Sequence, residues 1–363
     1  MIRYYQPAEC GLISSDAGDY YMWKFLYWLL PLLALSGYFK FSGNEIGLFF
    51  TAAAAIIPLA GLMGEATENL ACYTGERIGG LLNATFGNAT ELLITIFALK
   101  AGLFTVVKAS LAGSILGNIL LVLGFAITAG SFQNGVQKFD RVHINNQTSL
   151  MFLSVIALII PAVFLFGETG PKLEHYSLVV ASILLLIYVA GLVFSFRHNS
   201  NNRACAVVEN AHWSRNHALG MLFLSTVLIA LESEFLVGAI ESVTALLGWS
   251  EFFIGIIIIP LIGNAAEHFT AVIMAWRNKI DLAFEIAVGS STQIALLVTP
   301  LLVFIGLFMG RQMSIIFDYY EIVAVGLAVL IAQFISLDGE SNWLEGSLLL
   351  AAYAIIAFGF YFV

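Results

Sequence analysis

The chain has 363 residues, of which 60% are hydrophobic and 11% are charged, and its mean hydropathy is +0.91. Soluble globular domains do not approach this composition, so we predict a polytopic protein whose main partner is the lipid bilayer. The formal net charge of −9 comes without a basic tract, which argues against nucleic acid as a partner.

A transmembrane helix needs roughly 20 consecutive apolar residues. Charged residues or clusters of Gly, Pro and Asn, such as Gly75-Glu76-Arg77, separate successive apolar runs in this sequence. The first ~20 residues contain Asp16 and Asp19 and no apolar core, so we expect no cleavable signal peptide. We predict an all-α membrane protein with eleven transmembrane helices, at 23–41, 45–72, 79–100, 103–130, 148–168, 174–197, 215–247, 251–278, 282–309, 315–336 and 341–363.

The distribution of lysine and arginine predicts the orientation, because these residues are retained on the cytoplasmic side of a membrane. With a cytoplasmic amino terminus and an external carboxyl terminus, ten basic residues lie inside and five outside. The inner ten are Arg3, Lys24, Arg77, Lys138, Arg141, Arg197, Arg203, Arg215, Arg277 and Lys279; the outer five are Lys40, Lys100, Lys108, Lys172 and Arg311.

One short pattern occurs twice within apolar runs. Gly87-Asn88-Ala89-Thr90-Glu91 lies in the third predicted span and Gly263-Asn264-Ala265-Ala266-Glu267 in the eighth, at an offset of 267 − 91 = 176 residues. The copies lie five spans apart, which is an odd number, so the two halves enter the membrane in opposite directions. Inverted repeats of this kind are typical of secondary transporters, whose site lies at the midplane between the repeats.

The same offset relates Gly113-Ser114 to Gly289-Ser290, and Glu65 to Glu241. We therefore divide the chain into four segments. They are an amino-terminal segment with the first span (1–44), a first five-helix repeat (45–197), a cytoplasmic inter-repeat loop (198–214) and a second five-helix repeat (215–363).

A carboxylate at membrane depth is costly and usually functional. Asn88 with Glu91, and Asn264 with Glu267, are three residues apart and share one helical face. Two antiparallel copies would form an all-oxygen site, which suits a hard cation such as Ca²⁺ and in which protons compete for the same carboxylates. Two alternatives stay open, namely glutamates paired with basic residues and asparagines that only join helices.

Several stretches resemble the calcium/proton exchangers of the calcium/cation antiporter superfamily. They are Gly-Asn-Ala-Thr-Glu-Leu-Leu-Ile-Thr-Ile-Phe-Ala-Leu-Lys (87–100), Val-Val-Lys-Ala-Ser-Leu-Ala-Gly-Ser-Ile-Leu-Gly-Asn (106–118) and Gly-Asn-Ala-Ala-Glu-His-Phe-Thr-Ala-Val (263–272), with shorter matches at 61–68, 233–237 and 287–296.

The resemblance implies an eleven-span antiporter in which Glu91 and Glu267 carry calcium and protons alternately. It also implies that Asn88 and Asn264 line the site and that Ser114, Ser290 and Gln293 orient the glutamates. No cofactor is expected besides the transported Ca²⁺ and H⁺. The inter-repeat loop has one acidic residue, Glu209, so calcium sensing there is not expected, and the missing long amino-terminal region of plant members suggests a prokaryotic inner-membrane protein.

Other acidic residues are candidates for a proton or access pathway. Glu65 and Glu241 are placed to line the two mouths, with Glu68, Glu232 and Glu234 near them; the alternative is a carboxylate that is simply solvated at a span end. His268 follows Glu267 and either passes protons or packs between helices. Gly113-x-x-x-Gly117 predicts close helix packing, and Pro58 and Pro260 predict kinks in the second and eighth spans.

Three other functions remain to be weighed. A sodium/calcium exchanger, or an exchanger of Mn²⁺ or Cd²⁺, would use the same fold. A channel would show symmetry between subunits, whereas this symmetry is internal. An intramembrane enzyme would need a catalytic motif, and the sequence has no His-Glu-x-x-His or Gly-x-Ser-x-Gly. Cys10, Cys72 and Cys205 lack metal spacing, and the sequence leaves a homo-oligomer open.

Overall fold

The computed structural model describes residues 31–165, 170–198 and 213–362. This part of the chain is helical apart from loops and two short strands, β1 Gln137–Lys138 and β2 Glu340–Ser341. The helices in the first half are α2 Leu32–Ser42, α3 Glu45–Phe86, α4 Ala89–Ala101, α5 Phe104–Leu116, η1 Gly117–Val122, α6 Leu123–Asn134, α7 Arg141–Leu165 and α8 Pro171–His198.

The helices in the second half are shorter and more often interrupted. They are α9 Arg215–Gly238, α10 Ile240–Leu247, α11 Glu251–Phe253, η2 Ile254–Ile258, α12 Ile259–Gly263, α13 Ala265–Trp276, α14 Ile280–Gln293, η3 Ile294–Val298, α15 Thr299–Phe308, α16 Tyr319–Ile335 and α17 Trp343–Tyr361.

Seven helical segments in the described part are long and apolar enough to cross a membrane. An eighth is added if the bent pair Glu251–Gly263 and Ala265–Trp276 counts as one span. This finding supports the predicted helical membrane protein, while the count of eleven spans stays a prediction. The first part of the predicted span at 23–41 lies outside the described residues, and α2 covers the remainder.

The residues Gly75-Glu76-Arg77, which separate the second and third apolar runs, do not form a loop. The α3 helix runs without a break through these residues, so helix rather than loop joins the second and third predicted spans. Glu and Arg favour helix, and a single Gly costs only about 1 kcal/mol there. The real interruption comes later, at Gly87-Asn88, directly before α4.

Other predicted boundaries also move. The predicted fifth span starts at 148, whereas α7 begins at Arg141, because polar residues continue the helix beyond the apolar run. The seventh predicted span is divided into α9 and α10 at Ala239, and the eighth is divided at Asn264. Pro58 lies inside α3 without ending it. These differences arise because hydropathy locates the bilayer crossing and backbone hydrogen bonding decides where helix begins and ends.

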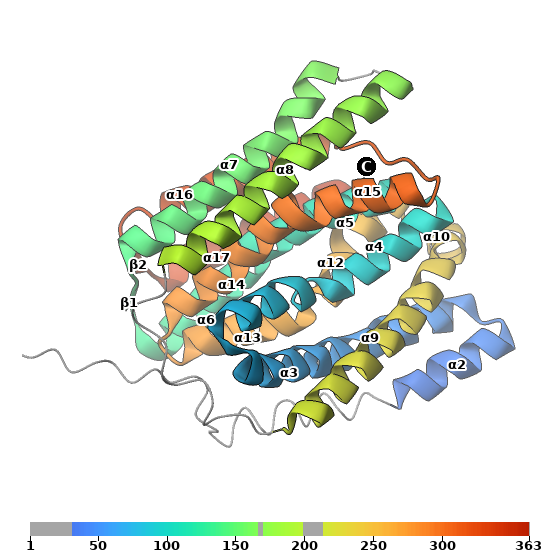
Figure 1. Ribbon diagram of the computed structural model, residues 1–363, viewed down its shortest axis with the longest axis horizontal. Coiled ribbons are helices and arrows are strands. Elements are labelled where there is room, and N and C mark those ends of the chain that lie inside the picture. Colours follow the sequence, from blue (N-terminus) through green and yellow to red (C-terminus); the bar gives the residue numbers. More distant parts are fainter. Residues whose placement is uncertain (1–30, 166–169, 199–212, 363) are drawn as a thin grey trace, which may run out of the picture.

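The helices α2, α3 and α9 lie together along one side of the molecule, away from α7 and α8 (Figure 1). A small apolar cluster joins α3 to α9, and it includes Leu59, Met63, Leu222 and Ile229. The other helices share one large core, to which Leu48 and Phe49 of α3 and Leu236 of α9 also belong. The molecule therefore has a peripheral group of helices, which we call the α2–α3–α9 group, beside a larger packed body.

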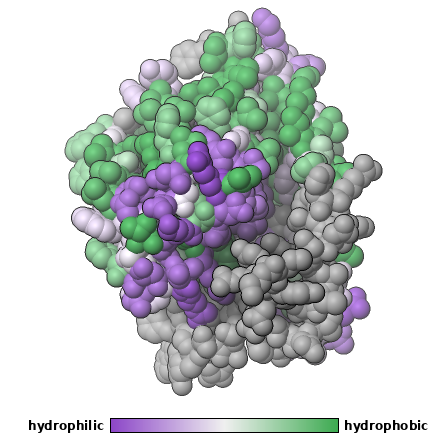
Figure 2. Space-filling model, turned by 90° about the vertical axis from the view of Figure 1, so that its left-hand side faces the viewer, coloured by the Kyte–Doolittle hydropathy of each residue, from purple (hydrophilic) through white to green (hydrophobic). Residues whose placement is uncertain are grey.

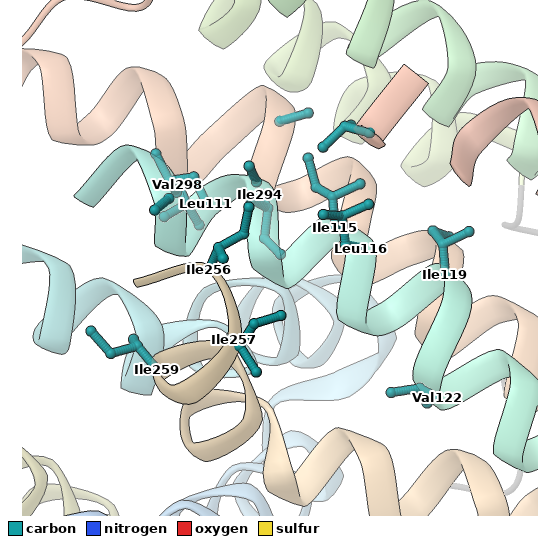
Figure 3. Packing of buried hydrophobic residues seen from close by; sticks show 14 of the residues in the cluster. Leu111, Ile115, Leu116, Ile119, Val122, Ile256, Ile257, Ile259, Ile294 and Val298 are labelled. Atoms are coloured by element: carbon teal, nitrogen blue, oxygen red, sulfur yellow. The ribbon is translucent and has the colours of Figure 1, made fainter. Parts of the chain in front are cut away.

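Three π-helical segments lie within the large core. Side chains of α5 and η1, among them Ile115 and Ile119, gather beside Ile256 and Ile257 of η2 and Ile294 of η3 (Figure 3). A π-turn inserts one residue into a helix and often occurs at functional sites. Here η1 begins at Gly117 and η3 at Ile294, close to the repeat offset of 176. The apolar packing excludes lipid and water from the polar groups described below.

Two loops meet at one end of the molecule through β1 and β2. These strands pair antiparallel, with Lys138 opposite Glu340, and the two side chains form an ion pair of 2.9 Å. Viewed from this end, hydrophilic residues gather in one patch and hydrophobic residues cover the flank beside it (Figure 2). The pairing therefore holds the loop before α7 and the loop before α17 at the same end of the molecule.

Candidate ion-binding site

The repeated pattern forms the same helix break in both halves. Asn88 has φ −96° and ψ 11°, and Asn264 has φ −100° and ψ 10°, so each residue leaves helical geometry in the same way. Each Asn occupies an N-cap position, yet neither side chain caps its own helix. Their amides are therefore available to other helices.

The breaks bring two helix amino termini to the site. Glu91 lies in the first turn of α4 and Glu267 in the first turn of α13. The unpaired N–H groups and the dipole at the start of a helix stabilise negative charge, typically by 0.3–1 kcal/mol. Both carboxylates are thus placed where the local backbone field favours an anion in an otherwise apolar environment.

Each glutamate lies against the glycine of the other half. A Cβ added to Gly263 would lie 2.8 Å from Cγ of Glu91, and one added to Gly87 would lie 3.5 Å from Oε1 of Glu267. The two carboxylates are also close enough to interact electrostatically. The glycines of the pattern therefore provide space for the opposing glutamate, and the structure brings the two halves of the pattern into one site.

On the Glu91 side, the amide of Asn264 is the central donor. Its Nδ2 donates to Oε1 of Glu91 at 2.6 Å and to Oγ of Ser114 at 3.1 Å. Glu91 is only 3% exposed, so this amide–carboxylate bond is shielded from water. The asparagine of the second half thus orients the glutamate of the first.

The Glu267 side is arranged differently. Asn88 donates through Nδ2 to Oε1 of Gln293 at 2.5 Å and accepts from Oγ of Ser290 at 3.1 Å. Ser290 also forms a hydrogen bond with the carboxylate of Glu267. Asn88 therefore acts on Glu267 through Ser290, whereas Asn264 contacts Glu91 directly.

Several buried oxygens at this site have no hydrogen-bond partner among the described residues. They are Oε2 of Glu91, Oε2 of Glu267, Oδ1 of Asn264 and Oδ1 of Asn118. An unpaired buried polar atom costs about 1–3 kcal/mol, so a group of them is unusual unless a ligand completes it. Carboxylate and amide oxygens are the ligands that Ca²⁺ prefers.

Asn118 was not singled out in the sequence, although it lies at the site. This η1 residue is 1% exposed and donates through Nδ2 to Oγ of Ser290 at 3.1 Å. The offset of 176 pairs Asn118 with Ile294, so a search for repeated polar residues could not find it. A polar side chain within the apolar run 115–127 was the available signal.

The four predicted pathway glutamates lie on α3, α9 and α10, outside the helices α4 and α13 that carry the central pair. Glu65 is partly buried, whereas the other three are exposed, namely Glu68 on α3, Glu234 on α9 and Glu241 on α10. Glu234 forms an ion pair of 3.6 Å with Lys100, at the end of α4. Their part in a pathway stays a prediction.

His268 follows Glu267 on α13, and its Nε2 is buried without a partner among the described residues. No group of three or more His, Cys, Asp or Glu side chains in the described part of the chain is arranged to hold a metal. A two-carboxylate site completed by amides and hydroxyls does not meet that criterion. The donor set is consequently oxygen-rich without resembling a His or Cys metal centre.

The family model described as "Sodium/calcium exchanger protein" matches residues 44–197 and 217–362. The chain belongs to this family. The two matched segments each contain one copy of the Gly-Asn-x-x-Glu pattern of the site. The resemblance to a calcium/cation antiporter is thereby confirmed.

Two bacterial proteins resemble this chain over most of their length. A Ca²⁺/H⁺ antiporter of Aphanothece halophytica is 45% identical over 339 residues, covering 88% of this chain and 91% of the relative. The Ca²⁺/H⁺ antiporter ChaA of Bacillus subtilis is 46% identical over 322 residues, covering 86% of this chain and 92% of the relative.

Solved structures show the same fold. Native YfkE has a TM-score of 0.83 at 42% identity, and the comparison covers 93% of this chain and all of that one. An H⁺/Ca²⁺ exchanger CAX has a TM-score of 0.71 at 16% identity, covering 95% of this chain and 93% of the other. At that identity the second comparison concerns the fold alone.

Proposed function

We propose that the protein is a secondary antiporter that exchanges Ca²⁺ for H⁺ across a membrane. The observation that carries this proposal is the pairing of Glu91 and Glu267 across two helix breaks, each against the glycine of the other half. The identity of 45–46% to two bacterial Ca²⁺/H⁺ antiporters points to the same exchange. These relatives are transporters and give no support for an enzymatic function.

The two glutamates bind calcium together with the asparagines of the site. Two carboxylates match the charge of a divalent cation, and the unpartnered oxygens of Glu91, Glu267 and Asn264 are hard donors. Ser114, Ser290 and Gln293 position these groups by hydrogen bonds, and Asn118 positions Ser290. Ca²⁺ is the cargo of the site, and no resident cofactor is required.

Proton coupling follows from competition for the same oxygens. Two carboxylates that repel each other in an apolar environment are unstable when both are charged and the cation is absent. The site therefore takes up protons when calcium leaves, and calcium must displace them to bind. Exchange results because the empty, doubly charged site is the costliest form to carry between the two sides.

The proposal includes eleven spans in two inverted five-helix repeats, with α2 outside the repeats. Equal backbone angles at Asn88 and Asn264, together with the reciprocal placement of the glutamates, support this symmetry. Alternating access then opens the shared site to one side at a time. The charge distribution and the bacterial relatives support a prokaryotic inner membrane with a cytoplasmic amino terminus.

Purified protein in liposomes tests the coupling directly. With an acidic interior, calcium uptake should follow the outward proton gradient and should not change when a sodium gradient is added. Uptake driven by sodium alone would contradict proton coupling and favour sodium/calcium exchange. Competition by Mn²⁺ and Cd²⁺ in the same assay measures selectivity among divalent cations.

Variants test the site. Glu91→Gln and Glu267→Gln should each abolish exchange, because each removes a charge that both ions need. Calcium binding to the detergent-purified protein should fall by at least about tenfold, which corresponds to ~1.4 kcal/mol. Glu340→Gln is the matched control, since it removes a carboxylate from the β1–β2 ion pair far from the site, and it should exchange normally. Wild-type exchange in either site variant would refute the assignment.

A further inference from the structure

A buried carboxylate lies outside the proposed exchange site, between α2 and α9. Glu232 is in the second half of α9 and is 3% exposed. Its Oε1 is 2.7 Å from Oγ of Ser36 on α2, and Ser36 is fully buried. Its Oε2 has no partner among the described residues, and neither does the buried hydroxyl of Ser233 beside it.

The Ser36 hydroxyl has two possible acceptors. Its Oγ lies 2.7 Å from the Glu232 carboxyl and 2.9 Å from the carbonyl oxygen of Leu33, in the preceding turn of α2. A hydroxyl carries one hydrogen and can also accept. When Glu232 is ionised, Ser36 donates to it and leaves Leu33. When Glu232 is protonated, the carboxyl donates to Ser36, and Ser36 donates to Leu33.

The protonated arrangement satisfies more of the buried polar atoms. It makes two hydrogen bonds in series and leaves no charge at the helix interface. The ionised arrangement makes one bond and keeps a buried charge whose second oxygen is unpaired, which is costly in an apolar environment. Separating α2 from α9 would relieve that cost by admitting water to the carboxylate.

In the described part of the chain, no ion pair joins a lysine or arginine to Glu232. Burial and the Ser36 hydroxyl are the influences that act on it. Lys40 of α2 lies 5.7 Å from the ring centroid of Phe235, and Lys100 of α4 pairs with Glu234. The charged and titratable residues on the elements packed against α9 are Tyr38 and Lys40 on α2, Glu45, Glu65, Glu68, Cys72, Tyr73, Glu76 and Arg77 on α3, Glu91 and Lys100 on α4, and Glu241 on α10.

We propose that Glu232 is a proton-binding site separate from the exchange site, and that its proton fastens α2 onto α9. The repeat offset pairs Glu232 with Ile56, so the site has no counterpart in the first half. The α2 helix is likewise outside the repeats. Protonation of Glu232 thus changes the contact between α2 and α9 within the α2–α3–α9 group and leaves Glu91 and Glu267 unchanged.

The test measures the separation of α2 and α9 directly, so it does not depend on the proposed exchange. In a full-length protein without native cysteines, spin labels replace Tyr38 and Phe223, which are both exposed. Distances are recorded between about pH 5.5 and pH 8.5, a range in which a buried carboxyl can titrate. The wild-type distribution should be narrow at low pH and broader or longer at high pH.

Glu232→Gln keeps a donor to Ser36 and cannot ionise, so its distribution should be narrow throughout the range. Ser36→Ala should broaden the distribution at low pH, and Ser36→Thr should restore it. Glu234→Gln, two residues away and exposed, is the matched control and should titrate like the wild type. A pH-independent wild-type distance, or an unchanged titration in Glu232→Gln, would overturn the proposal.

Infrared spectroscopy supplies a second readout, which holds even if α2 moves little. The difference spectrum between wild type and Glu232→Gln at low pH should show the loss of one protonated-carboxyl C=O component, while the components from the other buried carboxyls remain. In liposomes, this variant should flatten the alkaline part of the exchange–pH profile while calcium half-saturation stays within about twofold of wild type. A wild-type carboxyl band in Glu232→Gln would also refute the assignment.

Discussion

The contact between α5 and the broken helix η2–α12 is closed, whereas the repeat-related surface of α14 is open. A Cβ on Gly113 would overlap the backbone carbonyl of Ile256 and approach Cγ of Pro260 to 2.7 Å, and one on Gly255 would lie 2.7 Å from Cβ of Ala109. A Cβ on Gly289, the repeat counterpart of Gly113, would meet nothing within 4 Å.

This difference distinguishes two copies of one helix position. Backbone packs on backbone at Gly113 of α5, and the corresponding position Gly289 on α14 retains space. Glu91, hydrogen-bonded to Asn264, is 3% exposed, whereas Glu267 is partly exposed. The two similar halves are therefore packed differently around the candidate site in this structure.

The glycine pair offers the largest expected effect. Gly113→Ala forces α5 away from Ile256 and should lower the free energy of unfolding by about 1–3 kcal/mol. Gly289→Ala fills open space in a helix and should raise it by up to about 1 kcal/mol. Thermal unfolding in detergent measures both. Gly289→Ala should nevertheless slow exchange, because the proposed alternating cycle would bring a neighbouring helix as close to Gly289 as Ile256 is to Gly113 here. Equal stabilities of the two variants would contradict the expected difference between the two glycines.

The asparagines should differ next. Asn264→Ala removes a direct donor to the Glu91 carboxylate and should raise the calcium concentration for half-maximal exchange by about tenfold or more, since bonds to charged groups contribute ~1.5–3 kcal/mol. Asn88→Ala acts on Glu267 only through Ser290 and should have an effect of a few fold. Uptake measured against calcium concentration checks this. The reverse order would show that the hydrogen bonds in this state do not govern affinity.

Gln293 gives a smaller and more specific test. The repeat offset pairs it with Gly117, so Gln293→Gly makes the halves alike at this position. The Asn88 amide would lose its acceptor, and we expect a reduction of two- to fivefold in exchange rate, corresponding to roughly 0.5–1 kcal/mol. Initial rates in liposomes provide the measurement. Gln293→Glu serves as the contrast, because it keeps an acceptor and adds a third charge.

The smallest effect should come from the β1–β2 ion pair. A hydrogen bond from Lys138 to Glu340, together with the charge of that carboxylate, raises the pKa of the exposed Lys138 ammonium. A raised lysine pKa contributes stability that is present below the ordinary value of about 10.4 and is lost as pH rises through the folded value. Glu340→Gln should lower the melting temperature only slightly. The decrease should be detectable at low ionic strength near neutral pH and should disappear in high salt.

The sequence by itself determined the membrane class, the paired carboxylates and the family. These conclusions rest on composition and on residues at fixed local spacing, which the helix converts into shared faces. The sequence predicted close helix packing at Gly117, where the Cβ position is open. It also placed a separation between two spans at Gly75-Glu76-Arg77, where α3 continues. Those errors concern how far a helix continues and what it contacts, and neither is encoded in a single apolar run.

Only the tertiary structure decided which groups meet. It joined Asn264 to Glu91 across 173 residues of sequence, placed Asn118 on Ser290, and sealed Gly113 but not Gly289. The repeat makes the two halves look equivalent in sequence, and a symmetric pattern does not predict which of the two glycines, Gly113 or Gly289, is tightly packed. The physical reason is that the partners of each side chain come from helices far apart in the sequence, so two similar local patterns can pack differently.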